Sequence, residues 1–300
     1  MLLNQMIEKW LKDTTQMLNI RNLGLTEWPK QLIGKEYLMK KLNCGDNKLT
    51  SLPKDLTNLK TLYCHNNNKL ISLPNDFTKL VILNCSRNKL TSLPNNLTKL
   101  KILSCWNNKL TSLPNNLTKL EYSDCSDNEL TSLPNNLTNL KTLSCSRNKL
   151  TSLPNNLTNI KELYCSNNKL TSLPNNLTKL KILGCFNNRL ASLPNGLTNL
   201  KKLLCSNNEL TSLPNDLTNL KELFCPNNKL FSDELEKWKK IWPISLRHQR
   251  VLRNAGLEKV IKVLKNRLYL NRLDELHHEL IWSPNHPGKF FTLLPRVGQW

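Results

Sequence analysis

The sequence is poor in glycine and has no long apolar run. Glycine occurs only 8 times in 300 residues, and no glycine-rich loop of the kind that cradles a phosphate is present, which argues against a nucleotide site. No run of about 18 apolar residues occurs, so we expect no membrane-spanning helix. Residues 1–18 hold charges within their apolar part and no small-residue cleavage site, which argues against a secretory signal.

Motifs for metal binding and catalysis are also lacking. No pair of cysteines has CxxC spacing, and the histidines at 277, 278 and 286 do not form an HExxH pair. We therefore predict no metal, no cofactor and no enzymatic activity. The functions that this leaves open are those of a binding protein.

A 20-residue pattern, LxxLxCxxNxLxxLPxxLxx, fills the middle of the chain. With Met39 as position 1 of the first complete unit, nine further units begin at Leu59, Leu80, Leu100, Leu120, Leu140, Ile160, Leu180, Leu200 and Leu220. The unit at Leu59 is one residue longer, and we expect a loop at residues 65–68 to absorb the surplus. A unit this short cannot bury its own apolar side, so the pattern predicts a solenoid of stacked units.

Within a unit, positions 4 and 6 alternate with polar neighbours, as Leu103 and Cys105 do around Ser104. This period of two predicts a short strand with one buried face, and identical strands in successive units should pair in parallel. Positions 3, 5 and 7 would then face solvent on the concave side of the sheet. Proline at position 15 predicts extended backbone on the convex side.

The two ends of the chain depart from the pattern. Residues 1–38 predict a helical cap, with Leu3, Ile7, Trp10, Leu11, Thr14 and Leu18 on one side of a helix, followed by a degenerate repeat with Ile20 in the cysteine place. Residues 39–231 hold the ten repeats, and residues 232–300 predict a basic helical tail that caps the last one. The expected fold class is an α/β solenoid with a parallel concave sheet and helical caps at both ends.

The repeats resemble the leucine-rich repeat family, in its short form with leucine and proline on the convex side. They are similar to the repeats of bacterial effectors and to leucine-rich repeat proteins of giant DNA viruses, which favours a viral protein. The resemblance implies an arc that binds proteins, in which the asparagine at position 9, such as Asn108, bonds the backbone of neighbouring units. Effectors with such repeats can carry a ubiquitin-ligase domain with a cysteine nucleophile, but the tail of this chain has no cysteine.

All ten cysteines occupy position 6, from Cys44 to Cys225. We interpret them as buried thiols in the core; a metal array or a ladder of disulfides is the alternative, although parallel Cβ vectors suit a disulfide poorly. A column of thiols stays reduced in the cytosol, so we expect an intracellular, cytoplasmic protein. The five NLT glycosylation triplets that begin at Asn96, Asn116, Asn136, Asn156 and Asn176 would then carry no glycan.

The chain has 43 basic and 22 acidic residues, a net charge of +21, and the basic residues form rows. Position 2 holds Lys101, Lys141, Lys161, Lys181, Lys201 and Lys221, and position 10 holds Lys89, Lys109, Lys149, Lys169, Arg189 and Lys229. Such rows could bind nucleic acid phosphates or acidic proteins, or could serve solubility alone. Nucleic-acid binding is therefore the alternative to protein binding.

One unit, residues 120–139, breaks the pattern with acidic residues and with Ser123 in place of a core leucine. Aromatic and arginine side chains near the centre of a concave face are typical of an interface. We therefore predict a protein-binding site, while relaxed selection on one copy remains the alternative interpretation. The predicted site comprises Trp106, Tyr122, Asp124, Asp127, Arg147, Arg87, Tyr164 and Phe186. Neither the partner nor the oligomeric state follows from the sequence.

Overall fold

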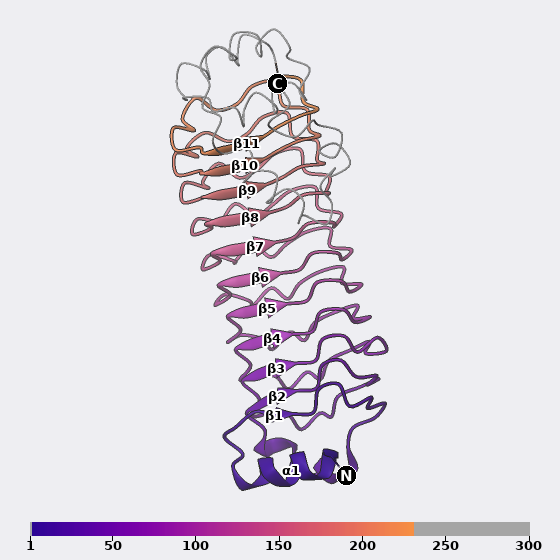
Figure 1. Ribbon diagram of the computed structural model, residues 1–300. Coiled ribbons are helices and arrows are strands. Elements are labelled where there is room, and N and C mark those ends of the chain that lie inside the picture. The colour runs from indigo at the N-terminus through magenta and orange to yellow at the C-terminus, as the bar shows by residue number, and fades with distance from the viewer. Residues whose placement is uncertain (1, 231–300) are drawn as a thin grey trace, which may run out of the picture.

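The computed structural model describes residues 2–230, which form a solenoid of stacked coils (Figure 1). Each coil contributes one short strand, and all eleven strands pair in parallel in one sheet in chain order. The strands are β1 (Leu18–Asn19), β2 (Lys41–Asn43), β3 (Thr61–Tyr63), β4 (Ile82–Asn84), β5 (Ile102–Ser104), β6 (Tyr122–Asp124), β7 (Thr142–Ser144), β8 (Glu162–Tyr164), β9 (Ile182–Gly184), β10 (Lys202–Leu204) and β11 (Glu222–Phe224). The predicted parallel concave sheet is confirmed.

The extra residue of the long unit leaves the core in register. Leu83 faces Leu103, an offset of 20 residues, whereas Leu62 faces Leu83, an offset of 21. The surplus falls between the buried Asn67 and the buried Leu70, in the loop after the strand. The insertion therefore leaves the strand register unchanged, as expected, and alters one bond of the neighbouring coil: Asn88 Oδ1 accepts the N–H of Asn67 at 2.9 Å.

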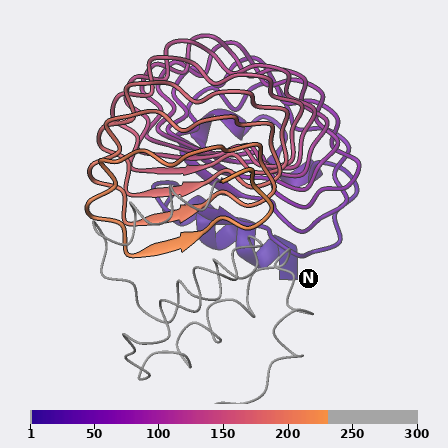
Figure 2. The ribbon, with the colours of Figure 1, turned by 90° about the horizontal axis from the view of Figure 1, so that it is seen from above.

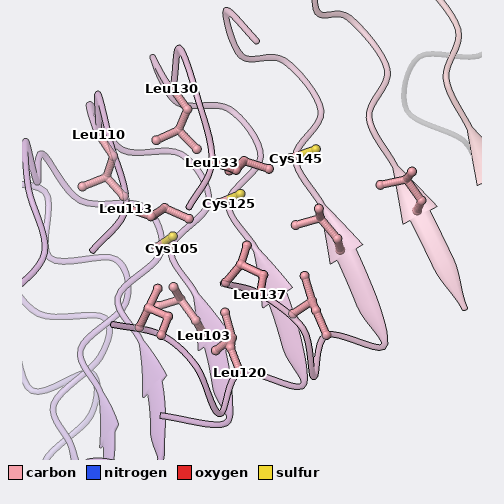
Figure 3. Packing of buried hydrophobic residues seen from close by; sticks show 14 of the residues in the cluster. Leu103, Cys105, Leu110, Leu113, Leu120, Cys125, Leu130, Leu133, Leu137 and Cys145 are labelled. Atoms are coloured by element: carbon pink, nitrogen blue, oxygen red, sulfur yellow. The ribbon is translucent and has the colours of Figure 1, made fainter. Parts of the chain in front are cut away.

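A continuous apolar core runs through the stack. The described units contribute mostly leucines from positions 1, 4, 11, 14 and 18 and the cysteine from position 6, and these leucines and cysteines are 0 to 9% exposed. Figure 3 shows Cys105, Cys125 and Cys145 side by side, with leucines of the same coils around them. Full burial of one leucine contributes roughly 1.5–3 kcal/mol, and no unit could obtain this burial alone.

The convex side is extended, with two tight turns in most coils. In the unit of β5 the chain is extended through Leu113 and Pro114, then turns at residues 115–116 and 118–119. The second turn is closed by the Leu120 N–H, which donates to the Leu117 carbonyl at 3.2 Å. Figure 2 shows that the strands lie along one side of the stack and that these loops arch around the other side.

The asparagines at position 9 form a buried hydrogen-bond ladder between coils. Asn108 donates from Nδ2 to the carbonyls of Cys85 and Cys105, at 3.0 Å each, and its Oδ1 accepts the N–H of Leu90 at 3.0 Å. The same pattern recurs to Asn228, whose Nδ2 lies 3.0 Å from the carbonyls of Cys205 and Cys225. The role implied by the family resemblance is confirmed.

A second ladder runs along the convex side through the asparagines of the NLT triplets. Asn96 donates from Nδ2 to the Asn75 carbonyl at 3.0 Å, and Asn156 donates to the Asn135 carbonyl at 2.8 Å. This amide nitrogen is the atom that would carry a glycan. Its hydrogen bond to the preceding coil gives the repeated asparagine a structural role.

Helix α1 (Leu2–Lys12) covers the end of the sheet beyond β1 (Figure 1). Its side chains Ile7 and Trp10 are buried against the first coil. The helix ends at Lys12, so the prediction that it extends to Leu18 was wrong. The reason is the Asp13 side chain, which accepts hydrogen bonds from the N–H and hydroxyl of Thr15 and holds a turn there.

The degenerate repeat lies where the sequence placed it. Leu18 in β1 faces Leu42 in β2, and Ile20 is fully buried in the column of cysteines. Two 3-10 turns follow, η1 (Lys30–Leu32) and η2 (Glu36–Leu38). The predicted tail cap, residues 232–300, lies outside the described residues.

Candidate functional site

The exposed strand face consists mainly of positions 3 and 5. Side chains at these positions are half-buried or exposed, whereas several serines at position 7, which we expected to face solvent, are buried. Ser86 and Ser166 are each only 2% exposed. Ser86 is covered because its hydroxyl bonds that of Ser104 on the next strand at 2.8 Å. Position 7 is thus shielded in some coils only, since Ser126, Ser146, Trp106 and Phe186 remain half-buried.

Arg87 and Trp106 come from consecutive coils and contact each other. The guanidinium carbon of Arg87 lies 4.7 Å from the centroid of the Trp106 ring. Arg87 occupies position 8, where φ is 54°, and every position 8 of the stack has this left-handed conformation. The fixed backbone directs each position-8 side chain along the edge of the sheet, which brings this pair of predicted site residues together.

Asp127 and Arg147, also at position 8 of consecutive coils, form an ion pair with Oδ1 and Nη1 3.2 Å apart. Both side chains are about two-fifths exposed. Exposed pairs of this kind contribute little stability, so the pair mainly fixes the two side chains relative to each other.

The acidic unit does not form an isolated acidic island. Glu121 bridges Lys101 at 3.2 Å and Lys141 at 2.6 Å, from the coils on either side. Hydrogen bonds from these lysines lower the pKa of Glu121. Glu129 likewise pairs with Lys149 at 2.8 Å. The acidic residues of the two rows are therefore neutralised by the lysines that flank them.

Tyr122, Asp124, Glu162 and Tyr164 lie together on the strand face, and we call these four residues the acidic–aromatic patch. Tyr122 and Asp124 lie in β6, at positions 3 and 5 of their repeat unit. Glu162 and Tyr164 lie in β8, at the same two positions of theirs. Burial, and then the charges of Asp124 and Glu162, raise the pKa of Tyr122. Burial also raises the pKa of Asp124, which forms no ion pair with a basic side chain of residues 2–230.

The other predicted site residue, Phe186, is half-buried one coil beyond Tyr164. The ring of Tyr164 leans over Gly184, where an added Cβ would lie 3.3 Å from the tyrosine Cδ1. The predicted residues therefore form three groups along the face: the Arg87–Trp106 pair, the Asp127–Arg147 pair with the acidic–aromatic patch, and Phe186.

Sequence reasoning missed two apolar residues and one carboxylate of this face. Ile102 of β5 is 40% exposed and faces Tyr122 of β6, which is 39% exposed; Ile82 of β4 continues the row. Glu162 completes the acidic–aromatic patch. All three occupy position 3 of their units. The strand pattern predicts this position to be exposed, so a large side chain there was the signal that could have identified them.

The convex side offers a hollow without reactive groups. A cavity of about 600 Å³ there is lined by the serines, leucines, prolines and asparagines of several coils, and none of them is ionisable. Within residues 2–230 no three His, Cys, Asp or Glu side chains come together as metal ligands. In the same range no helix has the length and apolar character required to cross a bilayer.

The ten cysteines are free, fully buried thiols. Burial raises the pKa of Cys85 and Cys125 to about 12. A thiol this hard to ionise is a poor nucleophile, because the thiolate is the reactive form. The column belongs to the core, as the sequence predicted.

Residues 58–80, 139–160, 159–180 and 199–220 match the family described as Leucine Rich Repeat. The match falls on units that contribute one parallel strand and one asparagine of the hydrogen-bond ladder each. These four segments of the solenoid match leucine-rich repeats, and the fold is that of a leucine-rich repeat arc.

Several solved leucine-rich repeat structures resemble this one. YopM from Yersinia enterocolitica WA-314 is 30% identical, with a TM-score of 0.56, over 70% of this chain and 50% of YopM. InlJ from Listeria monocytogenes, whose functional domain includes a cysteine ladder, is 30% identical, with a TM-score of 0.59, over 70% of this chain and 53% of the other. A chain of the Toll–Spatzle complex from Drosophila is 26% identical, with a TM-score of 0.57, over 71% of this chain and 33% of the other.

These likenesses concern the leucine-rich repeats alone. The chain spans about half the length of the YopM and InlJ chains that it matches. No curated protein sequence is significantly similar to it.

Proposed function

We propose that this leucine-rich repeat protein is a non-enzymatic scaffold that binds a protein partner on its concave strand face. The observation that carries the proposal is the pair Ile102 and Tyr122, which face each other on β5 and β6 and are 40% and 39% exposed. Among residues 2–230 they are the large apolar residues of the sheet that remain this exposed. Adjacent exposed apolar side chains ringed by polar groups are typical of an interface.

The neighbours of this pair support the same surface. Trp106 and its covering Arg87 lie at one edge, and the Asp127–Arg147 pair lies farther along that edge. Tryptophan, tyrosine and arginine are the residue types that contribute most to protein interfaces. One of the similar structures is a complex of Toll with Spatzle, which agrees with protein binding by this fold.

The test is capture of partners from cells by the full-length chain and by matched variants. We expect Ile102→Ser/Tyr122→Ala to lose the captured protein. Ile71→Ser serves as the control, because Ile71 is 61% exposed but follows the strand and its loop rather than lying on the sheet. Retention of the same partner by the double variant, with folding intact by circular dichroism, would refute this site.

A second candidate function, binding of nucleic acid, is favoured by one observation. Lysines from five consecutive coils stack at position 2. The backbone N–H of each of the last four donates to the carbonyl of the lysine one coil before it, at 2.7 to 2.8 Å. The five are Lys141, Lys161, Lys181, Lys201 and Lys221. Within residues 2–230 only Lys141 of these forms an ion pair. Binding of single-stranded DNA that weakens steeply with salt would favour this function, whereas an apolar protein contact should persist.

We also propose a cytoplasmic location and the short LP type of repeat, as in bacterial effectors and giant-virus proteins. A column of ten free thiols is suited to a reducing compartment. Fractionation of the native cell, with an antibody to the chain, tests the location.

A further inference from the structure

Two carboxylates on the strand face stand apart from the other acidic residues of the sheet and its edges. In the described coils, each acidic residue at positions 2 to 10 is paired with a basic side chain of a neighbouring coil, apart from two. The paired ones are Asp46, Glu121, Asp127, Glu129, Glu209 and Glu222, at 2.5 to 3.2 Å. The two without an ion pair are Asp124 and Glu162, and both belong to the acidic–aromatic patch.

The register of the sheet arranges the patch as a rectangle. Tyr122 faces Thr142, which faces Glu162, and Asp124 faces Ser144, which faces Tyr164. The two tyrosines thus occupy one diagonal and the two carboxylates occupy the other. Its sides measure about 10 Å across two strand spacings and about 6.6 Å along the strands.

Small side chains occupy the middle of the rectangle. Thr142 and Ser144 of β7 lie between the four larger corner residues. Tyr164 also leans away from β7, over Gly184 of β9. The middle is therefore open to an incoming group that contacts aromatic rings and carboxylates together.

We infer that this patch receives a single arginine side chain of the protein partner. A guanidinium group stacks on tyrosine rings and donates paired hydrogen bonds to carboxylates, so it matches both diagonals, whereas an ammonium group has no plane to stack. This inference rests on the proposed function, because it specifies the partner bound to the same strand face.

The basic rows restrict which partner can approach. Lys141 and Lys161 border the patch at position 2, and Lys149 and Lys169 border it at position 10. Only Lys141 and Lys149 have acidic partners among the described residues. A polybasic segment would be repelled by these rows, so the arginine should belong to a neutral or acidic segment.

Selection of random 12-residue peptides displayed on phage against the full-length protein would test this inference. We expect the selected peptides that compete for the strand face to share one arginine in a neutral or acidic context. Replacement of that arginine by citrulline, which keeps the shape and removes the charge, should weaken binding at least about tenfold in fluorescence polarisation, as loss of a charged hydrogen-bonded contact does.

A variant cycle assigns the arginine to the patch. Asp124→Asn/Glu162→Gln should remove the difference between the arginine and citrulline peptides, whereas Glu129→Gln/Glu209→Gln should preserve it, since those two residues are paired with Lys149 and Lys229. Citrulline peptides that bind as tightly as arginine peptides would overturn the inference, as would an undiminished difference in the Asp124→Asn/Glu162→Gln variant.

The same peptides separate the inference from the proposed function. Some selected peptides could lack a basic residue and still fail to bind the Ile102→Ser/Tyr122→Ala variant. That result would overturn the inference that the patch receives an arginine, and it would leave the strand face as the binding surface. Selected peptides that bind the Ile102→Ser/Tyr122→Ala variant as well as they bind the unaltered protein would overturn both.

Discussion

The guanidinium group of Arg87 lies over the indole ring of Trp106, 4.7 Å from the ring centroid, and so joins two consecutive coils through their side chains. A cation–π contact at an exposed site contributes about 0.5–1 kcal/mol. We expect a double-mutant cycle of Arg87→Asn and Trp106→Ala, measured by urea unfolding, to show a coupling of this size. Asparagine is chosen because it tolerates the positive φ of position 8.

Arg147 supplies the control for that cycle. It has the same residue type and the same φ of 54° but belongs to a coil beyond Trp106 and pairs with Asp127. Arg147→Asn and Trp106→Ala should therefore be additive. A coupling between Arg87 and Trp106 no larger than this control would show that the contact contributes nothing.

The buried asparagine ladder predicts a large effect of a small substitution. Asn128 donates to the carbonyls of Cys105 and Cys125 at 3.0 and 3.1 Å and accepts the N–H of Leu110 at 3.0 Å. Asn128→Ala leaves these buried groups without that partner, so we expect the free energy of unfolding to fall by at least about 2 kcal/mol. Asn115→Ala, at an exposed convex position, should change it by less than about 0.5 kcal/mol. Similar effects of the two substitutions in urea unfolding would contradict a structural role of the ladder.

Ser123 predicts a stabilising substitution. It is 1% exposed and faces Leu103 and Leu143, in a place that leucine fills in the other complete units. We expect Ser123→Leu to raise the free energy of unfolding by about 2 kcal/mol, because it fills space in the core and removes a buried hydroxyl. Ser144→Leu on the open face should have little effect. A destabilised Ser123→Leu variant would mean that the core has closed around the serine.

The thiol column predicts a loss of stability in alkaline solution. An exposed thiol ionises near pH 9, whereas burial raises the pKa of Cys85, Cys125 and Cys165 to about 12. Between these values the unfolded state binds fewer protons than the folded state. Each such thiol therefore lowers the free energy of unfolding as the pH rises above 9, with a slope that reaches about 1.4 kcal/mol per pH unit near pH 10 and ends near pH 12.

Substitution of three thiols tests this dependence. In the variant Cys85→Ala/Cys125→Ala/Cys165→Ala, the slope of unfolding free energy against pH should be shallower by about 3 kcal/mol per pH unit on average between pH 9 and pH 10, where the unfolded thiols go from half to nearly full ionisation. Urea unfolding at a series of pH values measures it. An unchanged slope would show that these thiols already ionise in the folded protein.

Sequence alone predicted the fold because its determinants are local and repeated. Ile20 could be assigned to the cysteine column, and the buried asparagines to a ladder, since each has the same neighbours one unit away. The end of α1 at Lys12 was missed because it depends on the Asp13 side chain, whose hydrogen bonds to Thr15 have no counterpart in the repeat.

The candidate site was less predictable, because it depends on how side chains from different coils meet. The sequence identified the residues of the acidic unit. It did not predict that Glu121 pairs with lysines of the coils on both sides. Ile102 and Glu162 attracted no attention in the sequence, since each looks ordinary in its own unit. Their significance follows from the neighbouring strands, because Ile102 faces Tyr122, and Glu162 lies two strands from Tyr122 in the same row.

The constant offset between coils also has an evolutionary consequence. Because Asn108 and Asn128 satisfy identical backbone groups one coil apart, deletion or duplication of a whole unit would rejoin donors to acceptors without a mismatch. Unequal recombination between such similar stretches of the gene could thus lengthen or shorten the molecule in steps of about 4.8 Å. Selection could adjust its reach in this way while the ends stay as they are.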